Sequence, residues 1–164
     1  MKSTALYLRT IVFGVIDSLV STVGLLAGID VAGAPHATIA LTGIVYAFVE
    51  GFSMAVGNYL SEESAEEYVA QASVGQRIPI VGGIIMFIVF VAVSFIPIFP
   101  YLIWNTDVAL YTSVFVSVAA LFVVGMVSAH LSKLSMTKRG LRMALLGGAA
   151  IIIGLTVGLL FPVA

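Results

Sequence analysis

The chain has 164 residues, of which 61% are hydrophobic and 9% are charged, and its formal net charge is -1. Soluble globular domains carry about 25% charged residues, so this composition excludes an ordinary soluble domain. The near-neutral charge excludes a nucleic-acid partner, and the absence of cysteine excludes disulfides and thiolate metal sites. We therefore expect an all-α integral membrane protein with a single transmembrane domain, residues 1–164, in contact with membrane lipid.

Five stretches are long and apolar enough to cross a bilayer as helices, since a span needs about 20 mainly apolar residues. The predicted helices are at about 8–29, 37–68, 77–99, 108–131 and 141–161.

Basic residues predict the orientation of these helices, because Lys and Arg accumulate on the cytoplasmic side. If the amino terminus is cytoplasmic, every Lys and Arg falls on that side: Lys2, Arg9, Arg77, Lys133, Lys138, Arg139 and Arg142. The carboxyl terminus at Ala164 is then extracytoplasmic, and we expect the cell membrane rather than an organelle.

The first predicted helix has an alternative interpretation as a signal peptide, because it has a basic start and a small-residue run at 32–34. Its apolar run is longer than a signal-peptide core of about 7 to 15 residues and contains Asp17, which favours a membrane span. At about 100° per residue, one small and polar face is shared by Gly14, Asp17, Ser21, Gly24 and Gly28. Such a face suits close helix contact rather than lipid.

The second predicted helix brings a carboxylate and a thioether into an apolar run. Glu50 and Met54 are four residues apart and therefore neighbours on the helix, and Asn58 continues the polar route. An ionisable group deep in hydrocarbon costs roughly 2.5 to 3.5 kcal/mol, so it usually marks a pathway. Counted from the inner helix ends, Asp17 and Glu50 differ by only ~3 Å in depth, so we expect both to line one cavity.

The second helix is predicted to continue into the cytoplasm as a stalk, residues 62–67, because 61–68 lacks Gly and Pro. Glu62 with Glu66, and Glu63 with Glu67, are like-charged pairs that are mildly destabilising unless a cation relieves them. Two interpretations stay open: a solvated stalk balanced by basic residues of another loop, and a cation-collecting entrance.

The remaining helices carry packing signals. Pro97 and Pro100 predict the end of the third helix or a kink in it. Gly154 and Gly158 form a GxxxG pair in the fifth helix, which is a weak packing signal by itself. Hydrogen bonds between helices are predicted for Ser113, Ser117 and Ser128.

The polar residues of the first two helices predict a site for a transition metal. Carboxylate oxygens attract any divalent cation, whereas thioether sulfur suits softer metals than Mg2+ or Ca2+. Such a site favours Fe2+, Mn2+, Co2+ or Zn2+ as a transported ion, with no permanently bound cofactor. The candidate metal ligands are Asp17, Glu50, Met54, Asn58, Glu62 and Glu66. For Met54 alone, simple core packing is the alternative role.

Burial favours the neutral form of a carboxyl group, so either intramembrane acid can exchange a proton for a metal ion. Five helices offer few ligands per protomer. A homodimer with the small, polar faces of the first two helices on its two-fold axis would duplicate Asp17, Glu50 and Met54 around one pore.

Three stretches resemble the vacuolar iron transporter family: DSLVSTVGLLAG at 17–28, SMAVGNYLS at 53–61 and IPIFPY at 96–101. The resemblance implies a five-helix homodimer that exchanges cytosolic Fe2+, often also Mn2+, for protons along a pathway between protomers. By motif, Asp17 and Met54 match the family's pathway aspartate and methionine.

The chain departs from the family pattern at several positions. Ser18 stands where glycine is usual, Asn58 where glutamate is common, and Glu50 where a small residue is usual. We therefore expect Glu50 to replace the carboxylate lost at Asn58. Residues 62–76 are too short for the family's glutamate-rich cytoplasmic metal-binding domain.

The function predicted from these observations is export of Fe2+ or Mn2+ from the cytosol, in exchange for protons. The alternative is a non-transporting membrane interaction protein in which Asp17 and Glu50 only specify assembly. An enzyme is not expected, because no nucleophile and base have a suitable spacing. His130 lies at a membrane edge, and His36 is predicted to be a solvated helix-end residue on the opposite side.

Overall fold

A computed structural model describes residues 3–73, 75–104 and 107–163. It consists of five helices: α1 (Ser3–Val31), α2 (His36–Ala70), α3 (Arg77–Ile103), α4 (Asp107–Leu131) and α5 (Met136–Leu160). All five are long and apolar enough to cross a membrane, so the predicted all-α architecture with five such helices is confirmed. Lys2 and Ala164, which entered the predicted orientation, lie outside the described residues.

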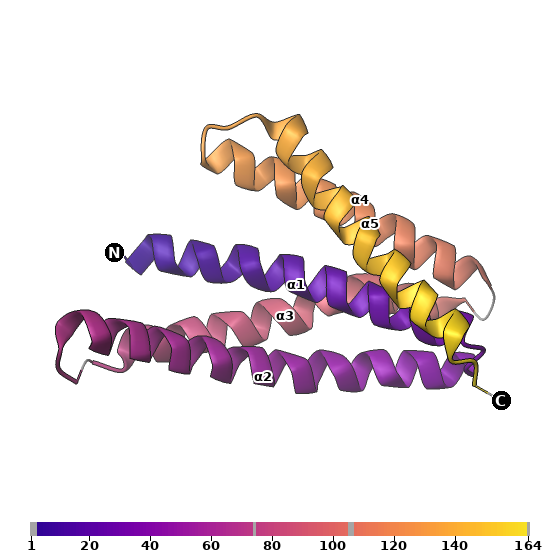
Figure 1. The fold of residues 1–164 in the computed structure, drawn as a ribbon, viewed down its shortest axis with the longest axis horizontal. Coiled ribbons are helices and arrows are strands. Elements are labelled where there is room, and N and C mark those ends of the chain that lie inside the picture. The colour runs from indigo at the N-terminus through magenta and orange to yellow at the C-terminus, as the bar shows by residue number, and fades with distance from the viewer. Residues whose placement is uncertain (1–2, 74, 105–106, 164) are drawn as a thin grey trace.

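The central helix is α1, which contacts each of the other four helices (Figure 1). The α2–α3 pair packs on one side of it and the α4–α5 pair on the other. Within the described ranges, α2 contacts neither α4 nor α5. In these ranges, the two helix pairs therefore contact each other where α3 meets α4, and elsewhere they are joined through α1.

The two ends of the bundle differ in charge. One end holds the start of α1 and the α2–α3 and α4–α5 turns, and the other holds the carboxyl terminus with the α1–α2 turn (Figure 1). The described basic residues belong to the first end: Arg9, Arg77, Lys133, Lys138, Arg139 and Arg142. We call it the basic end; its location in the cytoplasm stays a prediction.

The main buried cluster lies toward the opposite end, where four helices meet. It contains Leu26 of α1, Ile39 and Ala47 of α2, Ile98 and Tyr101 of α3, and Ala109 of α4. The polar clusters of α1 and α2 lie nearer the basic end than this apolar cluster does.

Two helices begin earlier than predicted. α1 begins at Ser3 rather than near residue 8, and α5 begins at Met136 rather than near residue 141. Hydropathy locates the membrane span, but less apolar residues before it can extend the helix, as Lys138 and Arg139, which are good helix formers, do at the start of α5. The predicted starts at 8 and 141 are therefore wrong by one to two turns.

The prolines of α3 do not end the helix, so the predicted end at 99 is also wrong. Pro97 and Pro100 lie inside α3, which continues to Ile103. Neighbouring helices bond to carbonyls of this part of α3: His36 Nε2 donates to Tyr101 O at 2.7 Å, and Ser113 Oγ donates to Pro97 O at 2.7 Å. The Ser113 prediction is confirmed.

The His36 bond corrects a second expectation. His36 is half-buried and fixes the start of α2 to the end of α3, whereas a solvated helix-end residue was predicted.

The hydrogen bond predicted for Ser117 is not found: Ser117 Oγ is buried and has no hydrogen-bond partner in the part of the chain that the structure describes.

α1 is attached to α3 by hydroxyl groups. Ser18 Oγ lies 2.8 Å from both Phe90 O and Ser94 Oγ, and Thr22 Oγ1 donates to Ser94 Oγ at 3.3 Å. These side chains are fully buried. Hydrogen bonding of this kind gives Ser18 a role that a glycine at the same position lacks.

α1 is attached to α5 through glycines. A Cβ atom added to Gly28 would lie 2.7 Å from Gly154 O, and one added to Gly158 would overlap Gly28 O. The close contact predicted for the small face of α1 therefore exists, but its Gly24 and Gly28 half is occupied by α5 of the same chain. That half is not available to a partner protomer.

Candidate functional site

The structure brings Asp17 of α1 and Glu50 of α2 together. Both side chains are half-buried, and their charges are close enough to interact. The Tyr46 hydroxyl lies beside Ser21 and near both carboxyl groups. Two acids and two hydroxyls from two helices thus form one polar cluster, and binding of a metal there stays a prediction.

Packing on α3 explains why these two acids face each other. Asp17 precedes Ser18, whose hydroxyl binds the α3 backbone. Glu50 precedes Gly51, where an added Cβ atom would lie 3.0 Å from Val91 Cγ2 of α3. Because successive residues are turned by about 100°, anchoring residue 18 or 51 to α3 turns the preceding acid toward the neighbouring helix.

Met54 and Asn58 line a cavity of about 310 Å³ between α1, α2 and α3. The remaining lining residues are Arg9, Thr10, Phe13, Ser53, Gly57, Ser61 and Met86. Phe13 lies four residues before Asp17, and Met54 lies four residues after Glu50. One helix turn, about 6 Å, therefore separates this cavity from the acid pair along both helices.

A second polar cluster forms nearer the basic end. Thr10 Oγ1 lies 3.4 Å from Asn58 Oδ1 and 3.4 Å from Glu62 Oε1. Gly82 of α3 makes room for it, since an added Cβ atom would lie 2.9 Å from both Asn58 Nδ2 and Glu62 Oε2. We call Thr10, Asn58 and Glu62 the inner cluster.

The inner cluster changes the interpretation of Glu62. This side chain is only 7% exposed, so it is not part of a solvated stalk, which was one of the two open interpretations. Glu62 Oε2 and Asn58 Nδ2 are buried and have no hydrogen-bond partner among the described residues. Buried polar atoms are nearly always paired, so Glu62 Oε2 is available to a proton or a cation, and Asn58 Nδ2 is available to a hydrogen-bond acceptor.

Sequence reasoning missed Thr10 and Gly82, which have no distinctive spacing. One available signal for Glu62 was its position four residues after Asn58, which is the spacing that also relates Glu50 to Met54. Charge alone does not distinguish the four acids of residues 62–67, although Glu62 is buried and the other three are more exposed.

The six predicted metal ligands do not form one site in a single protomer. Asp17 and Glu50 form one cluster, Asn58 and Glu62 belong to another, and Met54 lies between them. Glu66 is half-buried and belongs to neither. Of the residues that the structure describes, no three His, Cys, Asp or Glu side chains are grouped to hold a metal ion.

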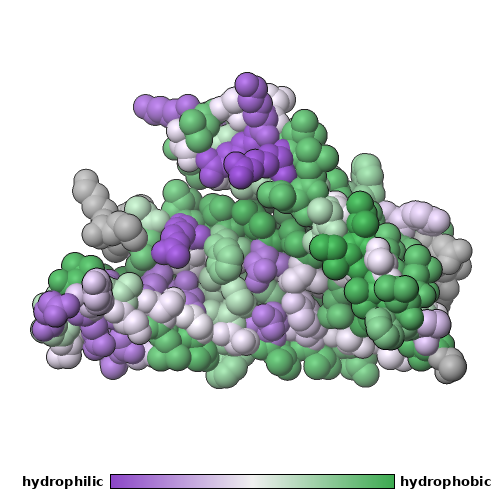
Figure 2. Space-filling view, in the orientation of Figure 1, coloured by the Kyte–Doolittle hydropathy of each residue, from purple (hydrophilic) through white to green (hydrophobic). Residues whose placement is uncertain are grey.

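The polar residues of α1 and α2 reach the surface of the protomer. Figure 2 shows hydrophilic groups along the region where α1 and α2 lie side by side, between larger hydrophobic areas. Ser53, Gly57 and Ser61 on α2 and Arg9 on α1 are exposed there. The face formed by α1 and α2 is therefore polar along much of its length, and we call it the polar face.

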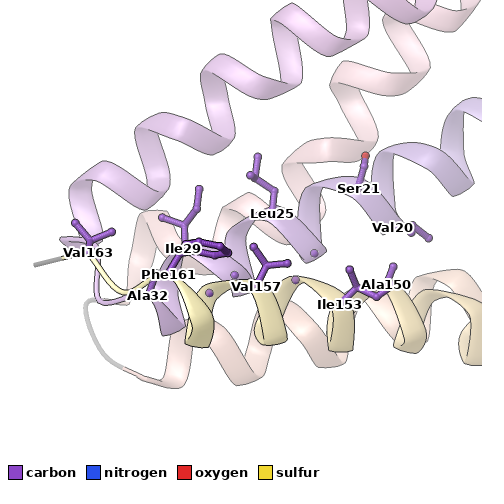
Figure 3. A pocket seen from close by; sticks show the side chains of 14 residues that line it. Val20, Ser21, Leu25, Ile29, Ala32, Ala150, Ile153, Val157, Phe161 and Val163 are labelled. Carbon is purple, nitrogen blue, oxygen red and sulfur yellow. The ribbon is translucent and has the colours of Figure 1, made fainter.

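A larger groove, about 530 Å³, follows α1 and α5 and has a different character. It is lined by Val20, Ser21, Leu25 and Ile29 of α1 and by Ile153, Val157 and Phe161, among others. In Figure 3, Ser21 is the one labelled side chain that carries an oxygen. The groove contains none of the six predicted ligands and offers no carboxylate, imidazole or sulfur donor.

Comparison with protein families gives one result that covers most of the chain. A family model described as the VIT family matches residues 8–78 and 70–159. The matched segments include both polar clusters and the cavity between them. No curated protein matches the sequence.

Proposed function

Because the chain belongs to the VIT family, the vacuolar iron transporters, and these are membrane metal-ion transporters rather than enzymes, we propose that it exports Fe2+ and Mn2+ from the cytosol. Export is in exchange for protons, and the ion moves along the face formed by α1 and α2.

The observation that carries this proposal is the row of polar side chains on α2. Glu50, Met54, Asn58 and Glu62 follow one another at intervals of four residues. Side chains spaced in this way share a face and advance by about 6 Å per step. Asp17 and Thr10 of α1 accompany the row at its two ends, so oxygen and sulfur donors follow each other from the acid pair to the basic end.

The chemistry of this row fits the proposed ions. Carboxylate and amide oxygens bind Mn2+ and Fe2+, and the Met54 thioether favours the softer metals over Mg2+ and Ca2+. Asp17, Glu50 and Glu62 can each carry a proton or a metal ion, which would couple the two fluxes. The row does not include Glu66, which is half-buried and lies outside both polar clusters.

A homodimer would complete the site, with the pathway between protomers. One protomer groups only two acids, and carboxylates facing lipid are costly, by roughly 2.5 to 3.5 kcal/mol each. A two-fold axis along the polar face would remove them from lipid and double the number of ligands. The dimer contact would use the α1–α2 side, because Gly24 and Gly28 already pack against α5.

Transport is tested with the full chain in liposomes. Fluxes of Fe2+, Mn2+, Co2+, Zn2+ and Ca2+ are measured with and without an imposed pH gradient. We expect Fe2+ and Mn2+ flux that depends on the gradient, and no Ca2+ flux. Absence of flux for every metal, with a stable dimer, would support the alternative of a non-transporting membrane interaction protein.

A further inference from the structure

The basic end contains a second hollow, which borders the cavity of the proposed route at Arg9 and Phe13 and extends away from it on the other side of α1. Two adjoining cavities of about 660 and 480 Å³ lie between α1 and the α4–α5 pair, and Ile16 and Arg139 line both. Four basic side chains line them: Arg9, Lys138, Arg139 and Arg142. Neither described lining includes an Asp or a Glu.

The start of α5 adds to the positive potential of this hollow. Lys138 and Arg139 lie near the amino-terminal end of a 25-residue helix whose first turn has no acidic residue. Cations are unfavourable at this end of the helix dipole, and an anion is favourable. The Ser135 side chain, which lines the larger cavity, makes no capping hydrogen bond. The first N–H groups of α5 therefore remain available to an acceptor.

Close packing of α4 on α5 fixes the backbone that carries Arg139. A Cβ atom added to Gly125 of α4 would lie 2.7 Å from the Cα of Gly140, the residue after Arg139. Ser128 and Ser132 of the α4 end line the smaller cavity and supply further hydroxyl donors. The hollow thus combines fixed backbone, hydroxyls and guanidinium groups.

The chemistry of the lining indicates the kind of anion. A guanidinium group can donate two parallel hydrogen bonds to the oxygens of one phosphate, so phosphate is a suitable ligand for Arg139 and Arg142. From this basic part the lining continues with Val20, Met143 and Leu146, which are apolar. Figure 1 shows the α4–α5 pair diverging from α1 toward this end, and Figure 2 shows hydrophilic groups gathered over it.

We propose that this hollow binds an anionic phospholipid, with its phosphate among Arg9, Lys138, Arg139 and Arg142 and an acyl chain against Val20 and Leu146. Basic hollows between membrane helices are known to hold such headgroups. Phosphate is the shared chemistry of lipid and soluble ligands, and the apolar wall favours the lipid. The inference does not rest on metal transport.

The test uses full-length protein in neutral detergent, with binding measured by native mass spectrometry. Phosphatidylglycerol and phosphatidylcholine of the same acyl chains are compared. The variant R139Q/R142Q is matched by R77Q/K133Q, which also removes two positive charges but from exposed positions outside the hollow. We expect phosphatidylglycerol to bind preferentially, the first variant to weaken binding by about tenfold or more, and the control by less than about twofold.

Three results would overturn the proposal. They are equal binding of the two lipids, equal loss in the two double variants, and displacement of phosphatidylglycerol by an equal concentration of inorganic phosphate, which would indicate a soluble anion instead. If R139Q/R142Q does not fold, ionic strength provides the test on the unmodified chain. Added NaCl should weaken phosphatidylglycerol binding and leave phosphatidylcholine unchanged, and salt-independent binding would contradict the inference.

Discussion

α1 contacts α2 and α5 in opposite ways. Against α5 it presents Gly24 and Gly28, and backbone meets backbone with no room for a single added carbon atom. Against α2 it presents Thr10 and Asp17, and polar groups meet across a cavity of about 310 Å³ with buried atoms left unpaired. One helix therefore has a closed contact and an open one.

The difference separates stability from function along the chain. Tight glycine packing without polar groups holds α5 on α1 and offers nothing to an ion. Unpaired buried polar atoms and space for a ligand reduce stability, so they are expected where a site requires them.

The largest effect is expected at the closed contact. Gly158→Ala adds a carbon atom that overlaps Gly28 O, whereas Gly148→Ala on the same helix meets nothing within 4 Å. We expect Gly158→Ala to lower the unfolding free energy by about 2–3 kcal/mol, because overpacking forces the backbones apart. Thermal unfolding in detergent measures both variants. Equal melting temperatures for the two would show that the α1–α5 contact is not closed.

A smaller effect is expected for the inner cluster of the open contact. Glu62→Gln keeps the size of a buried side chain but removes its charge, and Glu66→Gln makes the same change at a more exposed position one turn away. We expect Mn2+ flux to fall by about tenfold in the first variant, because one charge-assisted contact to the ion is lost. Little change is expected in the second. Equal losses in the two variants would indicate that Glu62 acts like the other acids of the stalk and has no separate role in the inner cluster.

The smallest effect is expected at Met54, between the two clusters. Met54→Leu conserves volume, so the fold should be kept at a cost below about 1.5 kcal/mol. Removal of sulfur should lower Fe2+ flux several-fold relative to Mn2+ flux, because Mn2+ is better suited to oxygen ligands. Met86→Leu, which changes the other methionine of the same cavity, is the matched control. An unchanged Fe2+ to Mn2+ ratio would assign Met54 to packing.

Much of the fold was predictable because it depends on length and hydropathy. The five spans, the family resemblance at 17–28 and 53–61, and the Ser113 bond were all correct. Helix ends were less accurate, since hydropathy does not locate the polar start of α5, and the prolines of α3 are accommodated by hydrogen bonds from neighbouring helices.

The candidate site was predictable in its residues but not in its grouping. Asp17 and Glu50 could be paired by depth, because helix rise is regular. The burial of Glu62 could not be predicted, because it depends on Thr10, 52 residues away, and on the absence of a side chain at Gly82. The small face of α1 was also divided in a way that periodicity does not reveal, with Gly14 against α3 and Gly28 against α5.

We expect conduction of metal ions along the polar face of α1 and α2 to require the carboxylate of Asp17, so Asp17→Asn is the decisive variant. The variant is compared with Asp30→Asn, a change of the same kind at the far end of α1. Both proteins are reconstituted in liposomes and Mn2+ flux is measured under an imposed pH gradient. We expect flux to be lost in Asp17→Asn and retained in Asp30→Asn. Undiminished flux in a correctly folded Asp17→Asn protein would show that the polar face is not the ion pathway.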